Sequence, residues 1–272
     1  LFPYTTLFRS KFLFFSCIKL NLSFFTMKIN AYMLFFAWIL MALWGNVHAE
    51  KSPYELSWGT EAPILSLGVA TYIFSQYTYS QMEPRSGKPS KEDLLPWDKP
   101  FAGTFHPDLD GVSDWTLYAL IAFPLGFESV ELALGNSSGS EAATFLLTAL
   151  EITLWQSSLN LIVRSSRLWG RPEIYRSDAD RSRGEAWGSF YSGHTGAAFS
   201  LAVFSSLWFM EKYPNSAYVP LVWGGTLAVA TAVGVMRIAA GKHYPTDVLV
   251  GALVGSASSV LVLLLHRSSQ IN

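Results

Sequence analysis

The sequence is poor in charge and in cysteine. Only 14% of its 272 residues are charged, against roughly a quarter in a typical soluble domain. With 19 basic and 20 acidic side chains the formal net charge is −1, which excludes a protein that binds nucleic acid through a strongly basic face. The one cysteine, Cys17, excludes an intrachain disulfide, a zinc–thiolate cluster and a Cys-x-x-Cys redox site.

Hydrophobic residues, in contrast, are abundant. They make up 50% of the chain, and the mean hydropathy is +0.27. This content excludes a disordered polyelectrolyte, because such chains have too few apolar side chains to form a core. It favours a membrane protein or an unusually apolar exported protein.

The amino-terminal 49 residues have the pattern of a leader. Residues 1–26 show neither helical nor alternating periodicity and resemble translated upstream sequence, so we exclude them from the fold. From Met27 a basic start, an apolar run over 31–44 and an A-x-A-like site ending at Ala49 predict a cleaved signal peptide over 27–49. An uncleaved amino-terminal anchor is the alternative. Residues 50–114 are then expected to be an exported segment and an irregular loop.

Long apolar segments follow this leader. They have the ~20 residues that cross a bilayer or come close to it, and small residues within them suit close helix packing. The segments are Trp115–Leu134, Ala142–Val163, Thr195–Met210, Tyr218–Met236 and Val248–Leu265. A shorter segment, Pro63–Tyr79, could span the membrane, lie on its surface or pack on the bundle, and residues 80–113 are expected to be loop. The sequence predicts an all-α, membrane-embedded bundle of five to six helices, with its main body over 115–267.

The first polar segment between these helices is basic. Arg164 and Arg171 are seven residues apart, which is two helical turns, so both guanidinium groups can lie on one face. Guanidinium forks bind phosphate through two hydrogen bonds and keep their charge at any physiological pH. A juxtamembrane cluster that holds anionic lipid or sets the topology is the alternative interpretation.

The second polar segment begins a helix. Ser192, Gly193 and His194 precede the apolar run that starts at Thr195. Backbone N–H groups and the positive end of the helix dipole form an anion site at such a start. His194 adds a group that can donate a proton near neutral pH. A helix cap or a structural polar residue is the simpler alternative.

The third polar segment lies before the last helix. Pro245 is expected in the first turn of that helix, with His243 just before it and Asp247 within the opening turn. Asp247 can then accept a hydrogen bond from one imidazole nitrogen of His243 and raise the nucleophilicity of the other. Arg237 ends the preceding apolar segment. A helix-start carboxylate beside an ordinary loop histidine is the alternative.

In this order and at these spacings, the three segments resemble the type 2 phosphatidic acid phosphatase superfamily. The matching runs are Arg164-x6-Arg171-Pro172, Tyr191-Ser192-Gly193-His194 and Met236-Arg237-x5-His243-x3-Asp247. Three positions depart from the family pattern: Arg164 replaces lysine, Tyr191 replaces proline and Met236 replaces serine. These departures keep every expected charge, nucleophile and acid, so they put substrate preference in doubt more than activity.

The resemblance implies a two-step phosphoryl transfer with no metal and no cofactor. In it His243 is the nucleophile, oriented by Asp247, and His194 protonates the leaving oxygen. Arg164, Arg171, Arg237 and the Ser192–Gly193 backbone hold the phosphate oxygens. It further implies a phosphorylated lipid as substrate, the membrane as partner and no nucleic acid. We expect a multi-pass protein of the bacterial inner membrane. If residues 63–79 do not span, five spans place the site on the periplasmic side; if they do span, it faces the cytoplasm.

Three other functions fit parts of this pattern. They are a vanadium-dependent haloperoxidase, a soluble periplasmic acid phosphatase and a non-catalytic membrane protein that binds lipid headgroups. The motifs also leave His106, Glu128, Glu131 and Glu151 without a role. Carboxylates at membrane depth face a bundle interior or a polar cavity, so these glutamates either shape a substrate pocket or pair within the bundle.

Overall fold

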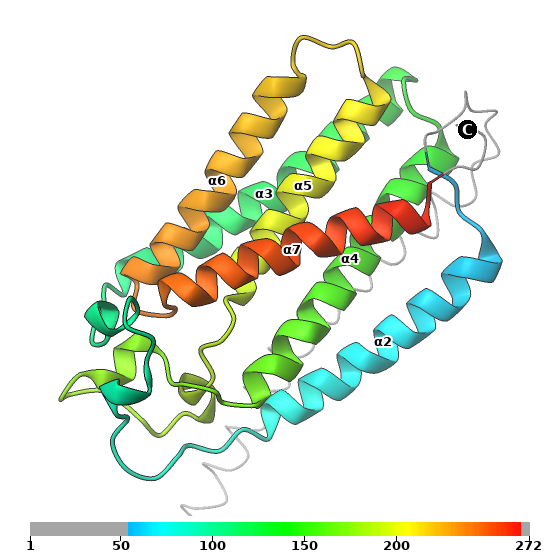
Figure 1. Ribbon diagram of the computed structural model, residues 1–272. Coiled ribbons are helices and arrows are strands. Elements are labelled where there is room, and N and C mark those ends of the chain that lie inside the picture. Colours follow the sequence, from blue (N-terminus) through cyan, green and yellow to red (C-terminus); the bar gives the residue numbers. More distant parts are fainter. Residues whose placement is uncertain (1–53, 268–272) are drawn as a thin grey trace, which may run out of the picture.

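The structure, a computed structural model, describes residues 54–267, and the leader expected over residues 1–49 lies outside them. Six α-helices make up most of the described chain (Figure 1). Their bounds are α2 Trp58–Ser80, α3 Asp108–Leu134, α4 Gly139–Ser165, α5 Gly193–Lys212, α6 Val219–Ala239 and α7 Pro245–Leu265. Short 3₁₀ turns interrupt the two long connections, α2–α3 and α4–α5. The prediction of an all-α bundle of five to six helices is therefore confirmed.

Capping side chains define where several helices begin and end. The hydroxyl of Ser138 accepts from the backbone N–H of Glu141 at 3.1 Å, which satisfies a free donor in the first turn of α4. Pro245 is the first residue of α7, as predicted, and Asp247 accepts from the backbone N–H of Tyr244 at 2.9 Å. At the end of α3, Gly135 takes the left-handed conformation with φ of 77°.

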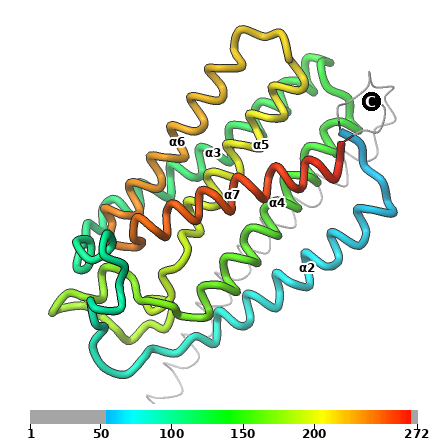
Figure 2. The backbone as a smooth tube through the Cα atoms, viewed as in Figure 1, coloured from blue at the N-terminus to red at the C-terminus, as the bar shows by residue number. Residues whose placement is uncertain are grey.

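Helix α5 forms the centre of the bundle. It contacts α3, α4, α6 and α7, while α2 packs along α4 (Figures 1 and 2). Glycines let α5 and α7 approach closely: a Cβ atom on Gly255 would lie 2.1 Å from the carbonyl oxygen of Gly196. Small residues at helix contacts are typical of bundles in lipid, and close packing through small residues was expected from the sequence.

Within the described residues, four helices are long and apolar enough to cross a membrane: α3, α4, α6 and α7. Their outward faces carry large exposed hydrophobic side chains, including Trp115, Leu221, Leu253 and Leu261, as a lipid-facing surface requires. We therefore describe the chain as a multi-pass membrane protein. The segment Thr195–Met210, expected as a fifth span, lies within α5 and is surrounded by the other helices.

The structure bears on two expectations about the amino-terminal part, and it contradicts one of them. The segment Pro63–Tyr79 belongs to a longer helix, α2, which packs on the bundle through α4. The expected loop over residues 80–113 is wrong in its last part, because α3 already begins at Asp108. The first turns of α3 contain two aspartates and a glycine, so their low hydropathy hid the start of the helix.

Candidate active site

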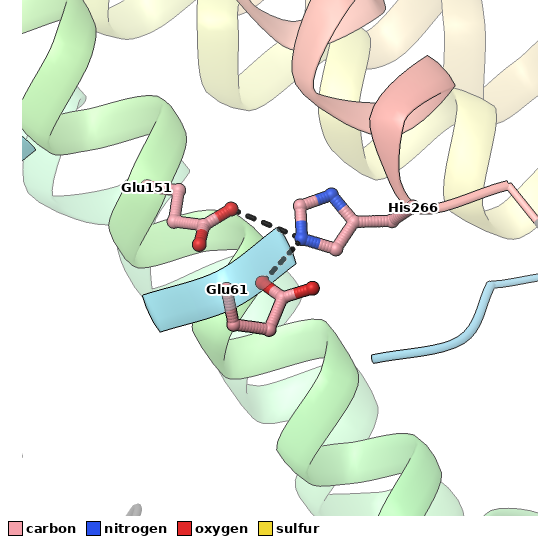
Figure 3. A group of neighbouring side chains, drawn as sticks. All are labelled: Glu61, Glu151 and His266. Carbon is pink, nitrogen blue, oxygen red and sulfur yellow. Dashed lines mark hydrogen bonds and ion pairs between the residues drawn. The ribbon is translucent and has the colours of Figure 1, made fainter. Parts of the chain in front are cut away.

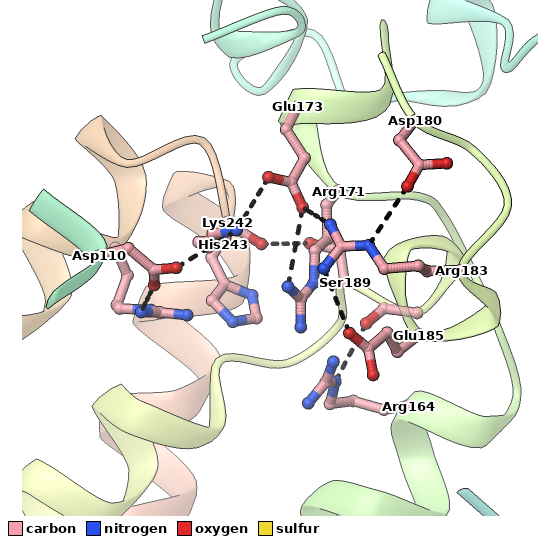
Figure 4. Close-up of polar contacts among 12 residues, drawn as sticks. Asp110, Arg164, Arg171, Glu173, Asp180, Arg183, Glu185, Ser189, Lys242 and His243 are labelled. Atoms are coloured by element: carbon pink, nitrogen blue, oxygen red, sulfur yellow. Dashed lines mark hydrogen bonds and ion pairs between the residues drawn. The ribbon is translucent and has the colours of Figure 1, made fainter. Parts of the chain in front are cut away.

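The three polar segments predicted to build one site come together at one end of the bundle. This end is formed by the end of α4, the start of α5, the end of α6 and the start of α7 (Figure 1). The connections 81–107, 166–192 and 240–244 lie over it. Figure 4 shows Arg164, Arg171 and His243 converging here from separate parts of the chain.

His243 lies at the centre of these groups and is 1% exposed. Its Nδ1 is 3.5 Å from Oδ2 of Asp247, longer than a normal N–H···O hydrogen bond. The hydrogen bond expected between these side chains is therefore not formed in this structure. The carboxylate of Asp247 instead accepts from the hydroxyl of Ser189 at 2.5 Å and from Nε1 of Trp169 at 3.1 Å. These contacts hold the carboxylate of Asp247 in place near Nδ1 of His243.

The environment of His243 keeps its ring neutral. Burial lowers the pKa of His243 well below its usual range, and the positive charges of Arg237, Arg171 and Arg164 act in the same direction. A neutral imidazole keeps a lone pair on one ring nitrogen. At pH 7 this residue therefore has the protonation state that a nucleophile needs.

Each of the three predicted arginines is buried and has an unpaired donor atom. Nε of Arg164 donates to the carbonyl of Gly188 at 3.0 Å, and its guanidinium lies 4.8 Å from the ring centre of Tyr79. Nη2 of Arg164, Nε of Arg171 and Nε of Arg237 have no hydrogen-bond partner within residues 54–267. A buried donor without a partner is costly, so three such donors around one histidine form a place for an oxyanion.

Carboxylates balance part of this positive charge. Glu173 accepts from Nζ of Lys242 at 2.9 Å and lies 3.8 Å from Nη1 of Arg171 (Figure 4). Lys242 also lies 3.3 Å from Oδ2 of Asp110. Glu173 is buried and follows Pro172, so the motif that supplies Arg171 also supplies its counterion.

Two aspartates on α3 complete the site, and the sequence interpretation missed both. Nε2 of His194 is 2.8 Å from Oδ1 of Asp114. Asp110 pairs with Nη1 of Arg237, which also donates to the hydroxyl of Ser113 at 3.0 Å. Asp110 and Asp114 are four residues apart and share one helix face. This spacing could have revealed them, had the helix been started before Trp115.

Ser192 and Gly193 have different surroundings. The backbone N–H of Ser192 donates to the carbonyl of Asp247 at 3.0 Å, and its hydroxyl accepts from Oγ1 of Thr195 at 2.9 Å. Ser192 is thus used in joining α5 to α7, and its N–H is not available to phosphate. Gly193 begins α5, where N–H groups have no partner within the helix. A Cβ atom there would lie 2.6 Å from Oδ1 of Asn160, so glycine fits this close approach.

The carboxylates left without a role are paired within the bundle. Glu128 accepts from the hydroxyl of Ser137, and Glu131 accepts from the hydroxyl of Tyr213. Both lie toward the end of α3 remote from the site, so pairing and not pocket formation accounts for them. His106 is exposed in the α2–α3 connection. Glu151 lies 3.0 Å from Nε2 of His266, at the end of α7.

Comparisons with known proteins agree with the motifs. Residues 153–270, which contain all eight predicted site residues, match the family model described as "PAP2 superfamily". Phospholipid phosphatase 1 of Rattus norvegicus is 30% identical over 79 residues, and that of Mus musculus is 32% identical over 79 residues. Each match covers 28% of this chain and 28% of the relative. The chain therefore matches little more than a quarter of the length of these curated relatives.

Two solved structures are also similar. A transmembrane PAP2 type phosphatidylglycerolphosphate phosphatase from Bacillus subtilis superposes with a TM-score of 0.47 and 19% identity, over 72% of this chain and 93% of that chain. Aquifex aeolicus LpxE superposes with a TM-score of 0.43 and 22% identity, over 63% of this chain and 99% of that chain. The resemblance inferred from the three motifs is confirmed by the family match.

Proposed function

We propose that this chain is a membrane phosphatase acting on phosphate monoesters or diphosphates of lipids, since residues 153–270 match the family model of the PAP2 superfamily. The reaction needs no metal ion and passes through a phosphohistidine. One observation carries this proposal: three buried arginines surround a neutral histidine, and each has a donor atom without a partner among residues 54–267. Phosphoryl transfer requires this combination of positioning and cationic donors around three equatorial oxygens.

In the first step His243 attacks phosphorus. The lone pair of its Nε2 forms the N–P bond while the bond from phosphorus to the ester oxygen breaks. The proton on Nδ1 stays on the ring and faces Asp247, whose carboxylate stabilises the positive charge that develops. The present 3.5 Å separation shortens as this charge appears, because hydrogen bonds of an active site are often long before substrate binds.

His194 supplies the proton that the leaving oxygen needs. Burial and the charge of Arg237 lower the pKa of His194 to about 4, and Asp114 opposes this through the 2.8 Å contact, which also orients the ring. The negative charge of a bound phosphate favours the protonated ring in the same way. We assign Asp114 as a positioning residue, since it acts through His194. In the second step the now neutral His194 accepts a proton from water as the water oxygen attacks phosphorus. The N–P bond then breaks, phosphate leaves and both histidines regain their starting states.

The phosphate oxygens are held by Arg164, Arg171 and Arg237, with the N–H of Gly193 as a fourth donor. Arg164 replaces the lysine usual in the family. Its fork keeps one arm on the carbonyl of Gly188 and leaves Nη2 for phosphate. A lysine could not make both contacts from a planar group, so this substitution adds a fixed orientation to the charge.

An apolar cavity supports a lipid substrate. It lies between α3 and α6, has a volume of about 400 Å³ and is lined by Leu120, Phe123 and Val229 among others. Leu120 is six residues after Asp114, or about 9 Å along the helix. An acyl or isoprenoid chain in this cavity would place its phosphate at the start of α3. The curated relatives carry the name phospholipid phosphatase, which supports the same class of substrate.

The location of the site in the cell is part of this proposal. The site lies at one end of the candidate spans α3, α4, α6 and α7, so it faces one side of the membrane. The expected signal peptide supports a bacterial inner membrane. Helix α2 runs from its contact with His266 at one end of the bundle to its contact with Arg164 at the other. After an exported start, an α2 that does not cross the membrane places the site on the periplasmic side, and an α2 that does cross places it on the cytoplasmic side.

The test is a phosphate-release assay on protein purified in detergent, with chelator present. The panel contains a lysophosphatidate, a phosphatidate, an isoprenoid diphosphate and an aryl phosphate. We expect release by the wild type and by the His106→Ala control, which alters an exposed histidine, and a loss of more than 95% in His243→Ala. Equal release by His243→Ala would contradict the proposal. Vanadate-dependent halide oxidation without phosphatase activity would instead indicate a haloperoxidase.

A further inference from the structure

A second group of ionisable side chains lies deep in the bundle, away from the candidate active site. Glu61 of α2, Glu151 of α4 and His266 at the end of α7 point toward one another (Figure 3). Nε2 of His266 is 2.9 Å from Oε2 of Glu61 and 3.0 Å from Oε2 of Glu151. All three side chains are at most 3% exposed. The group therefore joins three helices through charged atoms without solvent.

The backbone contact of Nδ1 determines that Nε2 of His266, which faces the two glutamates, carries the lone pair of the neutral ring. Nδ1 lies 2.8 Å from the carbonyl oxygen of Val262, which can only accept, so Nδ1 carries a proton. A neutral ring then presents an unprotonated Nε2 to two carboxylates. This arrangement of a backbone carbonyl behind an imidazole is the one that orients metal-binding histidines in proteins.

Protonation of His266 alone does not satisfy the group. A single Nε2–H bonds to one acceptor, and here that acceptor is Glu61. Oε2 of Glu151 has only the 3.0 Å ion pair with the same Nε2, and Oε1 has no hydrogen-bond partner within the described part of the chain, although the side chain is 0% exposed. Oε1 of Glu61 accepts from the backbone N–H of Ser57 at 3.3 Å, which leaves its Oε2 for the group.

The net charge of the three side chains also indicates a bound cation. Two carboxylates and one imidazolium have a net charge of −1, and Glu151 lies within a candidate membrane span. Uncompensated charge at membrane depth is costly and marks a functional group by default. A proton on one glutamate would also bring the net charge to zero, but it bonds to one acceptor. Two carboxylates, a neutral imidazole and a divalent cation likewise have a net charge of zero, and the cation contacts both glutamates and the imidazole at once.

We propose that Glu61, Glu151 and His266 bind a divalent transition-metal ion, with Zn²⁺ as the first candidate and Mn²⁺ as the second. One imidazole and two carboxylates form a ligand set suited to these ions, and the three side chains leave a further coordination position for water or a second carboxylate oxygen. Ligand atoms at about 2.1 Å from an ion are about 3.4 Å apart in the tetrahedral geometry of Zn²⁺ and about 3.0 Å apart at the right angles of an octahedral site. The two nitrogen–oxygen distances, 2.9 and 3.0 Å, match the octahedral spacing, so a tetrahedral ion requires the side chains to move slightly apart, and all three ligand atoms lie within 4.8 Å of one another.

The bound ion is structural. It fastens the start of α2 to the end of α7, next to the backbone contact from the N–H of Glu55 to the carbonyl of His266 at 2.9 Å. Glu151 precedes Arg164 by 13 residues on α4, which is about 20 Å along the helix. The ion would therefore not touch the phosphate site, and this inference is independent of the proposed phosphatase activity.

The experiment measures metal uptake by the full chain in detergent, after proteolytic removal of any histidine tag and treatment with chelator. The protein is dialysed against Zn²⁺ or Mn²⁺, and bound metal is counted by mass spectrometry. We expect about one ion per chain in the wild type. In Glu151→Gln, which keeps the side-chain volume, we expect affinity weaker by more than about 100-fold. The matched control is Glu128→Gln, a buried carboxylate of another group, which should bind as the wild type does.

A second measurement, on unmodified protein, does not depend on whether the variant folds. Saturating Zn²⁺ should raise the unfolding temperature of the chelator-treated wild type by on the order of 5 °C. Mg²⁺, which prefers oxygen ligands, should not raise it. Wild-type protein that takes up less than a tenth of an equivalent of either transition metal would overturn the proposal, and so would equal uptake by Glu151→Gln. Either result would assign the group to a buried ion pair.

Discussion

Replacing Asp114 by asparagine tests whether this carboxylate acts through His194. The change keeps the size of the side chain and removes its negative charge at 2.8 Å from the imidazole. A hydrogen bond between charged groups contributes about 1.5–3 kcal/mol. The side chains of His194 and Asp114 are 35% and 42% exposed, so solvent screening places this pair at the lower end of that range.

A contribution of about 1.4 kcal/mol corresponds to a tenfold change in rate. We therefore expect Asp114→Asn to lower kcat about tenfold on an alkyl or lipid phosphate. His194→Ala should lower it by about 10²–10⁴-fold, because the whole general acid is lost. Both losses should be smaller on an aryl phosphate, whose leaving oxygen is less basic. Asp108→Asn, an exposed carboxylate in the first turn of the same helix, is the matched control and should leave kcat unchanged.

The double variant separates action through His194 from action elsewhere. In a His194→Ala background the Asp114→Asn change should alter kcat by less than about twofold, because the group that Asp114 positions is gone. Asp114 also lies 3.7 Å from Nη1 of Arg237. A tenfold loss that persists in the His194→Ala background would refute the assignment and would indicate that Asp114 acts through Arg237.

Three further predictions concern pH, chelation and packing. The acid limb of the kcat/KM profile reports the pKa of the nucleophile in the free enzyme. This limb should lie below pH 6.5, because the pKa of His243 is lowered. Arg171→Gln should shift the limb to higher pH by on the order of 1 unit, since one positive charge near His243 is removed. Activity at 25 °C should survive excess EDTA and be inhibited by vanadate, a mimic of the transition state; loss of activity that added Mg²⁺ restores would contradict an arginine-based site. Gly255→Val should lower the free energy of unfolding by about 1–3 kcal/mol or more, because the valine side chain would collide with the Gly196 backbone. Thermal unfolding in detergent measures this loss. Gly224→Ala is the control and should be unaffected, because the space around Gly224 is open.

The three motifs could be recognised from the sequence because the residues of each motif lie close together along the chain. Pro245 at the start of α7 brings His243 and Asp247 together within one helix turn, and spacing along the chain predicts such proximity. Apolar runs similarly predict helices, because burial in lipid depends on composition. Helix ends were less predictable: capping by Ser138 extends α4 to Gly139, beyond the apolar core of the segment.

Contacts between distant elements could not be predicted in this way. Asp114 and His194 are 80 residues apart, and Glu61 and His266 are 205 residues apart. Such pairs depend on the register of one helix against another, which no local pattern encodes. The distance between His243 and Asp247 could not be predicted from the sequence either. It depends on Ser189 and Trp169 of the α4–α5 connection, which donate hydrogen bonds to the carboxylate of Asp247.

Trapping the phosphoenzyme tests the central claim most directly. Purified protein is mixed with a ³²P-labelled substrate, quenched within milliseconds and analysed for label on the chain. We predict label that is stable to alkali and labile to acid, as for a phosphorus–nitrogen bond, at up to one equivalent per chain in the wild type and in His106→Ala. His243→Ala should carry none. Acid-stable label, or label that remains in His243→Ala, would contradict the account.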